Sequence, residues 1–286
     1  MLSSPAMHVT DAHIHVQPWW ELGPAVLEAM TRGRDDVAEL QAIMKSPERL
    51  LKRLDADGIA RAVLVNYPSP DTMGFTDKVN EYVARYCEAA PDRLIPMGGV
   101  HPRFTLDAAG DVRRAADMGI RALKIHPPHM VVSPNAYLHG MEALRALYGE
   151  AQRLKLPVMI HTGTSVFPGA RSRMGEPMAV DDVAVDFPDL TLILAHGGRP
   201  LWMEQAFFLV RRFPHVFMDV SSIPPKAILR YFPRLPEIAH KVLYGSDWPA
   251  PGVRSMGANL KDFVALGLPK EAEQRILETN ARALFP

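Results

Sequence analysis

The chain of 286 residues contains a single cysteine, Cys87, and has no formal net charge. A lone cysteine cannot form a disulfide within the chain or supply a cluster of thiolate ligands, so we expect Cys87 to be a buried, reduced thiol. Basic and acidic residues both number 32, and no basic run interleaved with aromatic residues follows the pattern of a nucleic-acid-binding surface. We therefore expect no nucleic-acid partner.

Long hydrophobic segments are also missing. No apolar run approaches the roughly 20 residues that cross a bilayer, and the opening MLSSPAM lacks the basic and apolar parts of a secretory signal. We expect a cytoplasmic protein without a membrane partner. No GxGxxG motif follows an expected strand, which disfavours an open doubly wound sheet that binds a dinucleotide.

Short aliphatic or β-branched runs recur along the chain, and a segment with helical periodicity follows each of them. This alternation predicts eight strands, at His8 to His15, Ala62 to Asn66, Leu94 to His101, Ala122 to His126, Val158 to His161, Thr191 to His196, Val216 to Val220 and Val242 to Asp247. Their interiors are apolar on both faces, as in parallel strands covered by helices. We therefore predict an α/β fold, a (β/α)8 TIM barrel that forms a single domain over residues 1–286.

The connecting segments carry helix signals of their own. In SPERLLKRLDADG, Ser46 is expected to cap a helix that has Pro47 at its first position and Gly58 after its end. A last helix, Pro269 to Phe285, is expected to complete the ring. Two connections, Gln17 to Lys45 and Thr162 to Pro177, are long for this architecture, and long loops in compact domains are often functional.

Polar, mostly ligand-capable residues end nearly every expected strand, where a (β/α)8 barrel carries its chemistry. In the stretch DAHIH, His13 and His15 are two residues apart and share one face of a strand. By itself this pair fits a hydrogen-bonded core equally well. His161 and Asp247 at other strand ends would complete a set of three imidazoles and one carboxylate, suited to Zn²⁺ or to Mn²⁺ or Fe²⁺.

The segments DAHIH, LKIHPP, VMIHTG, LAHGG and YGSDWP, in this order and followed by NARALF, resemble the amidohydrolase superfamily. The likeness is closest to the amidohydrolase 2 branch, which includes hydrolases, lactonases and non-oxidative decarboxylases of aromatic or unsaturated carboxylic acids. It extends from Asp11 to Phe285. The resemblance implies a distorted barrel that holds a divalent metal, and it makes a homodimer or larger homo-oligomer reasonable.

The resemblance also implies roles for individual residues. His13 and His15 match the first-strand pair, His161 the fifth-strand ligand and His196 the sixth-strand histidine, which we expect to be catalytic. Asp247 matches an aspartate that commonly both touches the metal and moves the proton. Binuclear relatives carry a carbamylated lysine between two metals, and Lys124 matches its position. Because the branch favours one metal, we expect Lys124 to be a catalytic, electrostatic residue first and a carbamate bridge second.

Other residues near the strand ends are candidates for binding the substrate. A guanidinium can clamp a carboxylate, and an aromatic ring can form an apolar wall. The candidates are His101, His126, Arg171, Arg173, Arg199 and Trp248. For His101 and His126 a purely structural role is an equal alternative, and for each arginine a solvated surface position is an alternative as well.

The leading functional hypothesis is metal-dependent hydrolysis of a C–N or C–O bond in a small carbonyl compound, an amide, lactone or ester. A metal would make hydroxide available at neutral pH, Asp247 would move the proton, and His196 with Lys124 would stabilise the oxyanion. The alternative is a carboxy-lyase that releases carbon dioxide from an aromatic or unsaturated acid at the same site. A non-catalytic binding protein is disfavoured because metal ligands occur together with an acid-base pair.

Overall fold

The computed structural model describes residues 7–286, so the MLSSPAM opening lies outside the described residues apart from Met7. Eight parallel strands form one sheet in chain order, and hydrogen bonds between the last and the first strand bring its edges together into a nearly closed barrel. The strands are β1 (Thr10–Ile14), β2 (Arg61–Val65), β3 (Leu94–Gly98), β4 (Ala122–Ile125), β5 (Val158–Gly163), β6 (Leu192–Arg199), β7 (Val216–Asp219) and β8 (Val242–Leu243).

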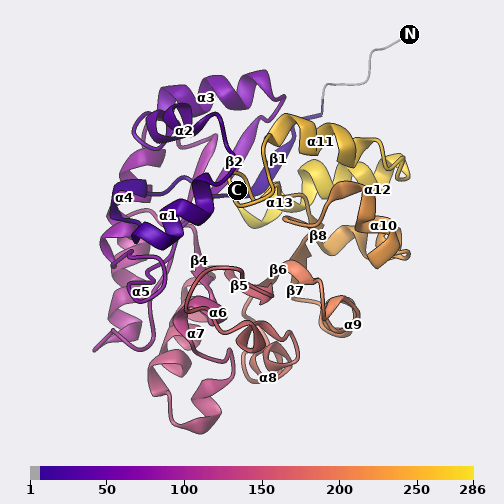
Figure 1. Ribbon diagram of the computed structural model, residues 1–286. Coiled ribbons are helices and arrows are strands. Elements are labelled where there is room, and N and C mark those ends of the chain that lie inside the picture. The colour runs from indigo at the N-terminus through magenta and orange to yellow at the C-terminus, as the bar shows by residue number, and fades with distance from the viewer. Residues whose placement is uncertain (1–6) are drawn as a thin grey trace.

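Helices surround the strands on all sides (Figure 1). They are α1 (Pro24–Thr31), α2 (Val37–Ile43), α3 (Pro47–Ala56), α4 (Lys78–Cys87), α5 (Ala108–Asp117), α6 (Pro127–Met130), α7 (Glu142–Leu154), α8 (Ala179–Asp186), α9 (Met203–Arg212), α10 (Ile228–Tyr231), α11 (Met256–Val264), α12 (Lys270–Gln274) and α13 (Asn280–Leu284). Among residues 7–286, no helix combines the length and the apolar character needed to span a membrane.

The predicted barrel is confirmed, and each predicted strand overlaps an observed one. The largest difference is β8, which ends at Leu243 rather than at Asp247. Asp247 has a positive φ of 67° and precedes Trp248 and Pro249, so the chain leaves regular strand geometry there. At β6 the difference is reversed, since pairing continues past His196 to Arg199.

The helical predictions are also confirmed. The Ser46 hydroxyl accepts a hydrogen bond from the Arg49 amide, and Pro47 begins α3. The expected last helix is present as α12, a π-helical turn over Arg275–Thr279, and α13. The connection from Gln17 to Lys45, expected to be a long loop, contains two helices, α1 and α2.

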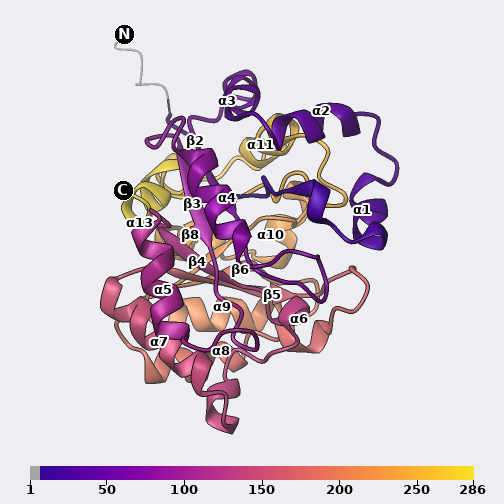
Figure 2. The same cartoon turned by 90° about the vertical axis from the view of Figure 1, so that its left-hand side faces the viewer.

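The barrel interior is apolar at its lower end, where the strands begin, and polar at its mouth, where the strands end. α13 closes the lower end, and Figure 2 shows it opposite α1 and α6, which lie over the mouth. A separate cluster of buried apolar residues fills the interior: Ala12, Val63, Val65, Ile95, Met97, Ala122, Met159, Ile193, Ala195, Leu243, Ala281 and Phe285. Two of them, Ala281 and Phe285, come from the end of the chain. Polar groups at the strand ends are therefore supported from below by a packed core.

The seam between β8 and β1 is closed partly by a side chain. The Ala12 amide donates to the Tyr244 carbonyl at 2.9 Å, and the Asp247 amide donates to the His13 carbonyl at 2.8 Å. Between these bonds, Oδ1 of Asp11 accepts from the amides of His13 and Ser246 at 3.1 and 2.9 Å. The Asp11 carboxyl thus replaces a backbone acceptor where the two strands do not pair regularly.

We predict that Asp11→Ala lowers the free energy of unfolding by about 2 kcal/mol or more, because two buried amide donors lose their acceptor. Burial raises the pKa of Asp11 to about 7, so the neutral amide in the matched Asp11→Asn control is expected to keep most of the stability. Urea denaturation in the presence of a chelator measures both without a contribution from bound metal. Equal stability of Asp11→Ala and wild type would contradict this account of the seam.

Candidate metal centre at the mouth of the barrel

The carboxyl ends of the strands surround a cavity of about 290 Å³. Residues that are far apart in the sequence meet on its walls, because parallel strands of a barrel all end at one mouth. The lining includes His15, Tyr67, Lys124, His126, His129, His161, Ser165, Phe167, His196, Arg199 and Asp247. Most of the residues expected to carry chemistry therefore lie on one cavity.

His13 lies just beneath this cavity, on a strand with an irregular register. The pairing of β1 with β2 shifts between Asp11 and Ile14, so Ala12 packs in the interior cluster while His13 also reaches inward to Asp219. Gly245, two residues after the end of β8, leaves room for His13, since a Cβ at position 245 would lie only 2.8 Å from the Cβ of His13. Simple alternation along a strand does not produce this arrangement.

Hydrogen bonds decide which ring nitrogen of His13 and His15 carries the proton. Nδ1 of His13 donates to the carboxylate of Asp219 at 2.8 Å, and Nδ1 of His15 donates to the Val65 carbonyl at 2.9 Å. Both partners can only accept, so in the neutral rings each Nε2 carries a lone pair. Burial lowers the pKa of His13, which favours its neutral form.

These two lone pairs face a third acceptor. Nε2 of His15 lies 3.1 Å and Nε2 of His13 lies 3.5 Å from Oδ1 of Asp247. Within residues 7–286, Nε2 of His13 and Oδ1 of Asp247 have no hydrogen-bond partner, although both are buried. Three acceptors this close repel one another unless a cation lies among them.

The donor set fits a divalent metal. In the described part of the chain, His13, His15 and Asp247 form one of two groups whose ligand atoms all lie within 4.8 Å of one another. Ligands about 2.1 Å from a tetrahedral ion are about 3.4 Å apart, which agrees with the 3.1 and 3.5 Å that separate Oδ1 of Asp247 from the two nitrogens. The second group, His13, His196 and Asp219, is accounted for by the hydrogen bonds that these residues make.

The Asp247 carboxylate is held in its charged form. Burial by itself would raise the pKa of Asp247, but neighbouring positive charge, including that of Arg199, outweighs the effect of burial and holds the pKa below its usual range. Asp247 and His196 also have positive φ angles of 67° and 66°. Residues other than glycine adopt such angles at an energetic cost, which is common where a side chain is aimed at a site.

His161 and His196 stand side by side on the cavity, with ring centroids 4.7 Å apart. Of the residues described, the close donor groups do not include His161. The structure therefore places this predicted ligand on the same cavity but outside the group of His13, His15 and Asp247, which we call the claw. His196 lies near the claw, with its ring 4.8 Å from that of His13.

Asp219 connects the claw to His196. Its Oδ2 accepts from His13, while its Oδ1 accepts from the Ser221 hydroxyl at 2.5 Å and from the His196 amide at 2.9 Å. Because that hydroxyl donates to a carboxylate, its oxygen accepts from Nδ1 of His196 at 2.8 Å. His196 therefore carries its proton on Nδ1 and presents a lone pair on Nε2.

Lys124 is completely buried inside the barrel. Its Nζ makes no hydrogen bond to any of residues 7–286. Burial lowers the pKa of Lys124 to about 8, although Asp219 and Asp247 favour the charged amine. The site thus holds a lysine that is mostly protonated at neutral pH but loses its proton far more readily than an exposed lysine.

The expected substrate-binding arginines separate into two sets. Arg199 lines the cavity, and its Nη2 lies 4.0 Å from Oδ2 of Asp247. Arg171 and Arg173 are exposed and do not contribute to the cavity lining found among residues 7–286. Only Arg199 is placed to meet a substrate at the claw.

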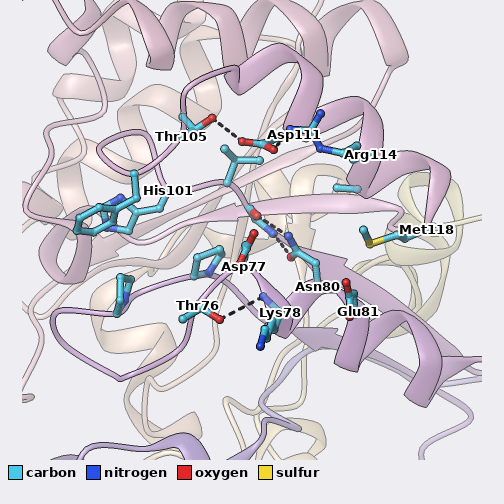
Figure 3. A pocket seen from close by; sticks show the side chains of 16 residues that line it. Thr76, Asp77, Lys78, Asn80, Glu81, His101, Thr105, Asp111, Arg114 and Met118 are labelled. Carbon is cyan, nitrogen blue, oxygen red and sulfur yellow. Dashed lines mark hydrogen bonds and ion pairs between the residues drawn. The ribbon is translucent and has the colours of Figure 1, made fainter.

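Two further candidates lie away from the cavity. Trp248 is fully buried in the hydrophobic core. His101 lines a separate cavity between α4 and α5 (Figure 3), where its ring packs 4.5 Å from that of Phe104 and its Nδ1 accepts from the Arg103 amide. His101 therefore does not contact the claw, whereas Trp248 contacts it only through its backbone, because its carbonyl accepts from the His15 amide at 2.7 Å.

Tyr67, His129 and Ser221 are not among the site residues predicted from the sequence. Tyr67 and Ser221 have no distinguishing pattern, since a tyrosine after a strand and a serine in DVSS are both common. His129 had a weak signal, its spacing of three from His126 in HPPH, which places both residues on one side of a helical turn. Both histidines line the cavity.

Comparison with known families gives one match over nearly the whole chain. The amidohydrolase family model (Amidohydro_2) matches residues 10–286. No curated protein matches the chain.

Solved structures resemble the fold throughout. An uncharacterised TIM-barrel protein from Bordetella bronchiseptica has a TM-score of 0.74 at 22% identity, covering 96% of this chain and 98% of that one. A 4-oxalomesaconate hydratase from Rhodopseudomonas palustris has a TM-score of 0.64 at 19% identity, covering 97% and 95%. A 5-carboxyvanillate decarboxylase from Novosphingobium aromaticivorans, complexed with manganese, has a TM-score of 0.65 at 16% identity, covering 96% and 94%.

We predict that Lys124 titrates near pH 8 in metal-free protein, because burial disfavours the ammonium. NMR of protein labelled with ¹³C at the lysine Cε positions measures this, and Lys124→Gln identifies the signal by its loss. A midpoint above about pH 10, the range of unperturbed lysines, would show that the Lys124 amine is solvated in solution.

Proposed function

The chain belongs to the amidohydrolase family, and we propose that it is a metal-dependent hydrolase that cleaves a C–N or C–O bond of a small, carboxylated carbonyl compound. An amide, a lactone or an ester is the expected substrate. The observation that carries the proposal is the set of three facing acceptors, Nε2 of His13, Nε2 of His15 and Oδ1 of Asp247. Members of this family are enzymes.

His13, His15 and Asp247 would hold one divalent ion, with His161 as the fourth protein ligand. Zn²⁺ fits this set of nitrogens and carboxylate oxygen best, and Mn²⁺ or Fe²⁺ are alternatives. When bound, the ion supplies Lewis-acid polarisation of a substrate oxygen and a lowered pKa for water. A second ion would need a carbamate on Lys124, and the lowered pKa of Lys124 supports that option because only the free amine reacts with carbon dioxide.

Asp247 is placed to move the proton. Its Oδ1 faces the two histidines, and its Oδ2 is directed toward Arg199. In hydrolysis it would accept a proton from the attacking water and return it to the leaving nitrogen or oxygen. The low pKa of Asp247 keeps it in the basic form that the first transfer needs.

His196 and Lys124 have different proposed roles in catalysis. The lone pair on Nε2 of His196 favours it as a hydrogen-bond acceptor or base, rather than as the oxyanion donor expected from the sequence. Lys124 keeps the electrostatic role, since its buried amine is mostly protonated at neutral pH and can stabilise negative charge on the carbonyl oxygen. Arg199 would bind the substrate carboxylate at the cavity wall.

A non-oxidative decarboxylase is the second candidate. The observation that favours it is the pair of cations, Lys124 and Arg199, on a cavity that also presents a metal claw, because together they can bind a carboxylate and a neighbouring hydroxyl. The manganese-containing decarboxylase among the similar structures has the same fold. The two reactions use nearly the same residues, so the difference lies in whether water enters the product.

We expect purified protein to contain about one equivalent of Zn or Mn per chain, and a chelator to remove it together with activity. Plasma mass spectrometry on protein made without a histidine tag measures the content. His15→Ala is expected to lose most of the metal, whereas His240→Ala, which removes an exposed histidine from the 3-10 helix Leu235–Lys241 before β8, should retain it. About two equivalents would indicate a carbamylated Lys124, and none would refute the metal centre.

Products distinguish the two reactions. With a panel of lactones, amides and hydroxybenzoates in H₂¹⁸O, we expect a carboxylate product that carries ¹⁸O, because hydrolysis adds an oxygen from water. Mass spectrometry of the products and measurement of carbon dioxide give the answer. Release of carbon dioxide without ¹⁸O in the organic product would favour the carboxy-lyase instead.

A further inference from the structure

Three imidazole rings are stacked on one wall of the cavity. His126 lies between His161 and His129, with ring centroids 3.8 and 3.5 Å away and interplanar angles of 19° and 16°. His126 is the N-cap residue of α6, His129 belongs to α6, and His161 belongs to β5. We propose that His126 and His129 are positioning residues that hold the ring of His161 in its metal-binding orientation. This inference rests on the proposed metal centre.

The end of the stack is fixed on every side. Nδ1 of His129 is hydrogen-bonded to the Tyr67 hydroxyl at 3.0 Å, and its Nε2 is hydrogen-bonded to the Ser165 hydroxyl at 2.7 Å. Its carbonyl accepts from the Thr72 hydroxyl at 2.9 Å. With both ring nitrogens held, His129 cannot turn without breaking buried hydrogen bonds. It therefore provides a rigid support for His126.

His161 needs this support more than the other two histidines do. The outer nitrogen of a ligating histidine normally makes a hydrogen bond that fixes the ring. Those bonds are 2.8 Å in His13 and 2.9 Å in His15, but Nε2 of His161 lies 3.3 Å from its acceptor, the Thr164 carbonyl.

The same contact indicates which nitrogen of His161 is free to bind a metal. Since the Thr164 carbonyl can only accept, the proton lies on Nε2 and the lone pair on Nδ1. Nδ1 is buried and has no hydrogen-bond partner among residues 7–286. Rotation of this ring would push it into His126, which in turn rests on His129, and close-packed rings cannot relax independently. The stack thus replaces a short hydrogen bond as the constraint on His161.

The test asks whether metal binding needs a flat ring at position 126 or the ring nitrogens of His126. His126→Phe keeps a flat ring, whereas His126→Ala removes it. We expect His126→Ala to weaken Zn²⁺ binding about 10- to 100-fold, as loss of a residue that orients a ligand typically does, and His126→Phe to stay within about threefold of wild type. Competition with a chromophoric chelator measures the affinity, and the visible spectrum of the Co²⁺ form reports the ligand geometry.

Control variants separate this effect from general damage. His215→Ala removes a histidine just before β7, at the opposite end of the barrel, and should bind Zn²⁺ as wild type does. His161→Ala should weaken binding at least as much as His126→Ala. His129→Phe, which keeps the ring but loses both hydrogen bonds, should weaken binding to a smaller extent and remains informative if His126→Ala does not fold.

The outcomes are distinguishable from a failure of the metal centre. If wild type binds no Zn²⁺, the proposed function fails. If wild type binds and His161→Ala weakens binding while His126→Ala does not, only the positioning role is overturned. Equal weakening by His126→Ala and His126→Phe would also overturn it, because the nitrogens of His126 rather than its ring would then be required.

Discussion

The repulsion among three acceptor atoms is the constraint around which the mouth of this barrel is organised. Nε2 of His15 and Nε2 of His13 lie 3.1 and 3.5 Å from Oδ1 of Asp247, and a cation is what makes such an arrangement favourable. The surrounding structure keeps these atoms together. The β1 irregularity, the Asp11 carboxyl at the seam and the absence of a side chain at Gly245 all act at the junction of the first and last strands.

Contacts behind the claw determine the tautomers and orientations of the histidine rings. Asp219 accepts from His13 on one oxygen and from Ser221 on the other, and Ser221 in turn accepts from His196. One buried carboxylate thereby sets the tautomer of a predicted metal ligand and, through a hydroxyl, that of a predicted catalytic residue. The imidazole stack supports His161 on the other side of the cavity by packing instead of by a short hydrogen bond. Hydrogen bonds thus orient the rings of His13 and His196, whereas packing orients the ring of His161.

The cavity also shows why a family assignment and a reaction are separate conclusions. The claw, Lys124 and Arg199 suit a carboxylated substrate whether a bond to nitrogen, oxygen or carbon is broken. The match to the amidohydrolase family over residues 10–286 agrees with the fold and with the ordered motifs. It does not choose among reactions, because related barrels use similar strand-end residues for different chemistry.

Local signals in the sequence were sufficient for the architecture and for the inventory of polar strand ends. Apolar runs alternate with helical periods whatever their surroundings, so the eight strands, the Ser46 cap and the positions of His13, His15, His161 and Asp247 could be read from the chain alone. The tertiary structure decided which of these residues meet. Arg199 and His126 reached the cavity while Arg171, Arg173, His101 and Trp248 did not. Tautomers, the Asp219 network and the imidazole stack depend on contacts between residues distant in sequence, and no local pattern encodes these distances.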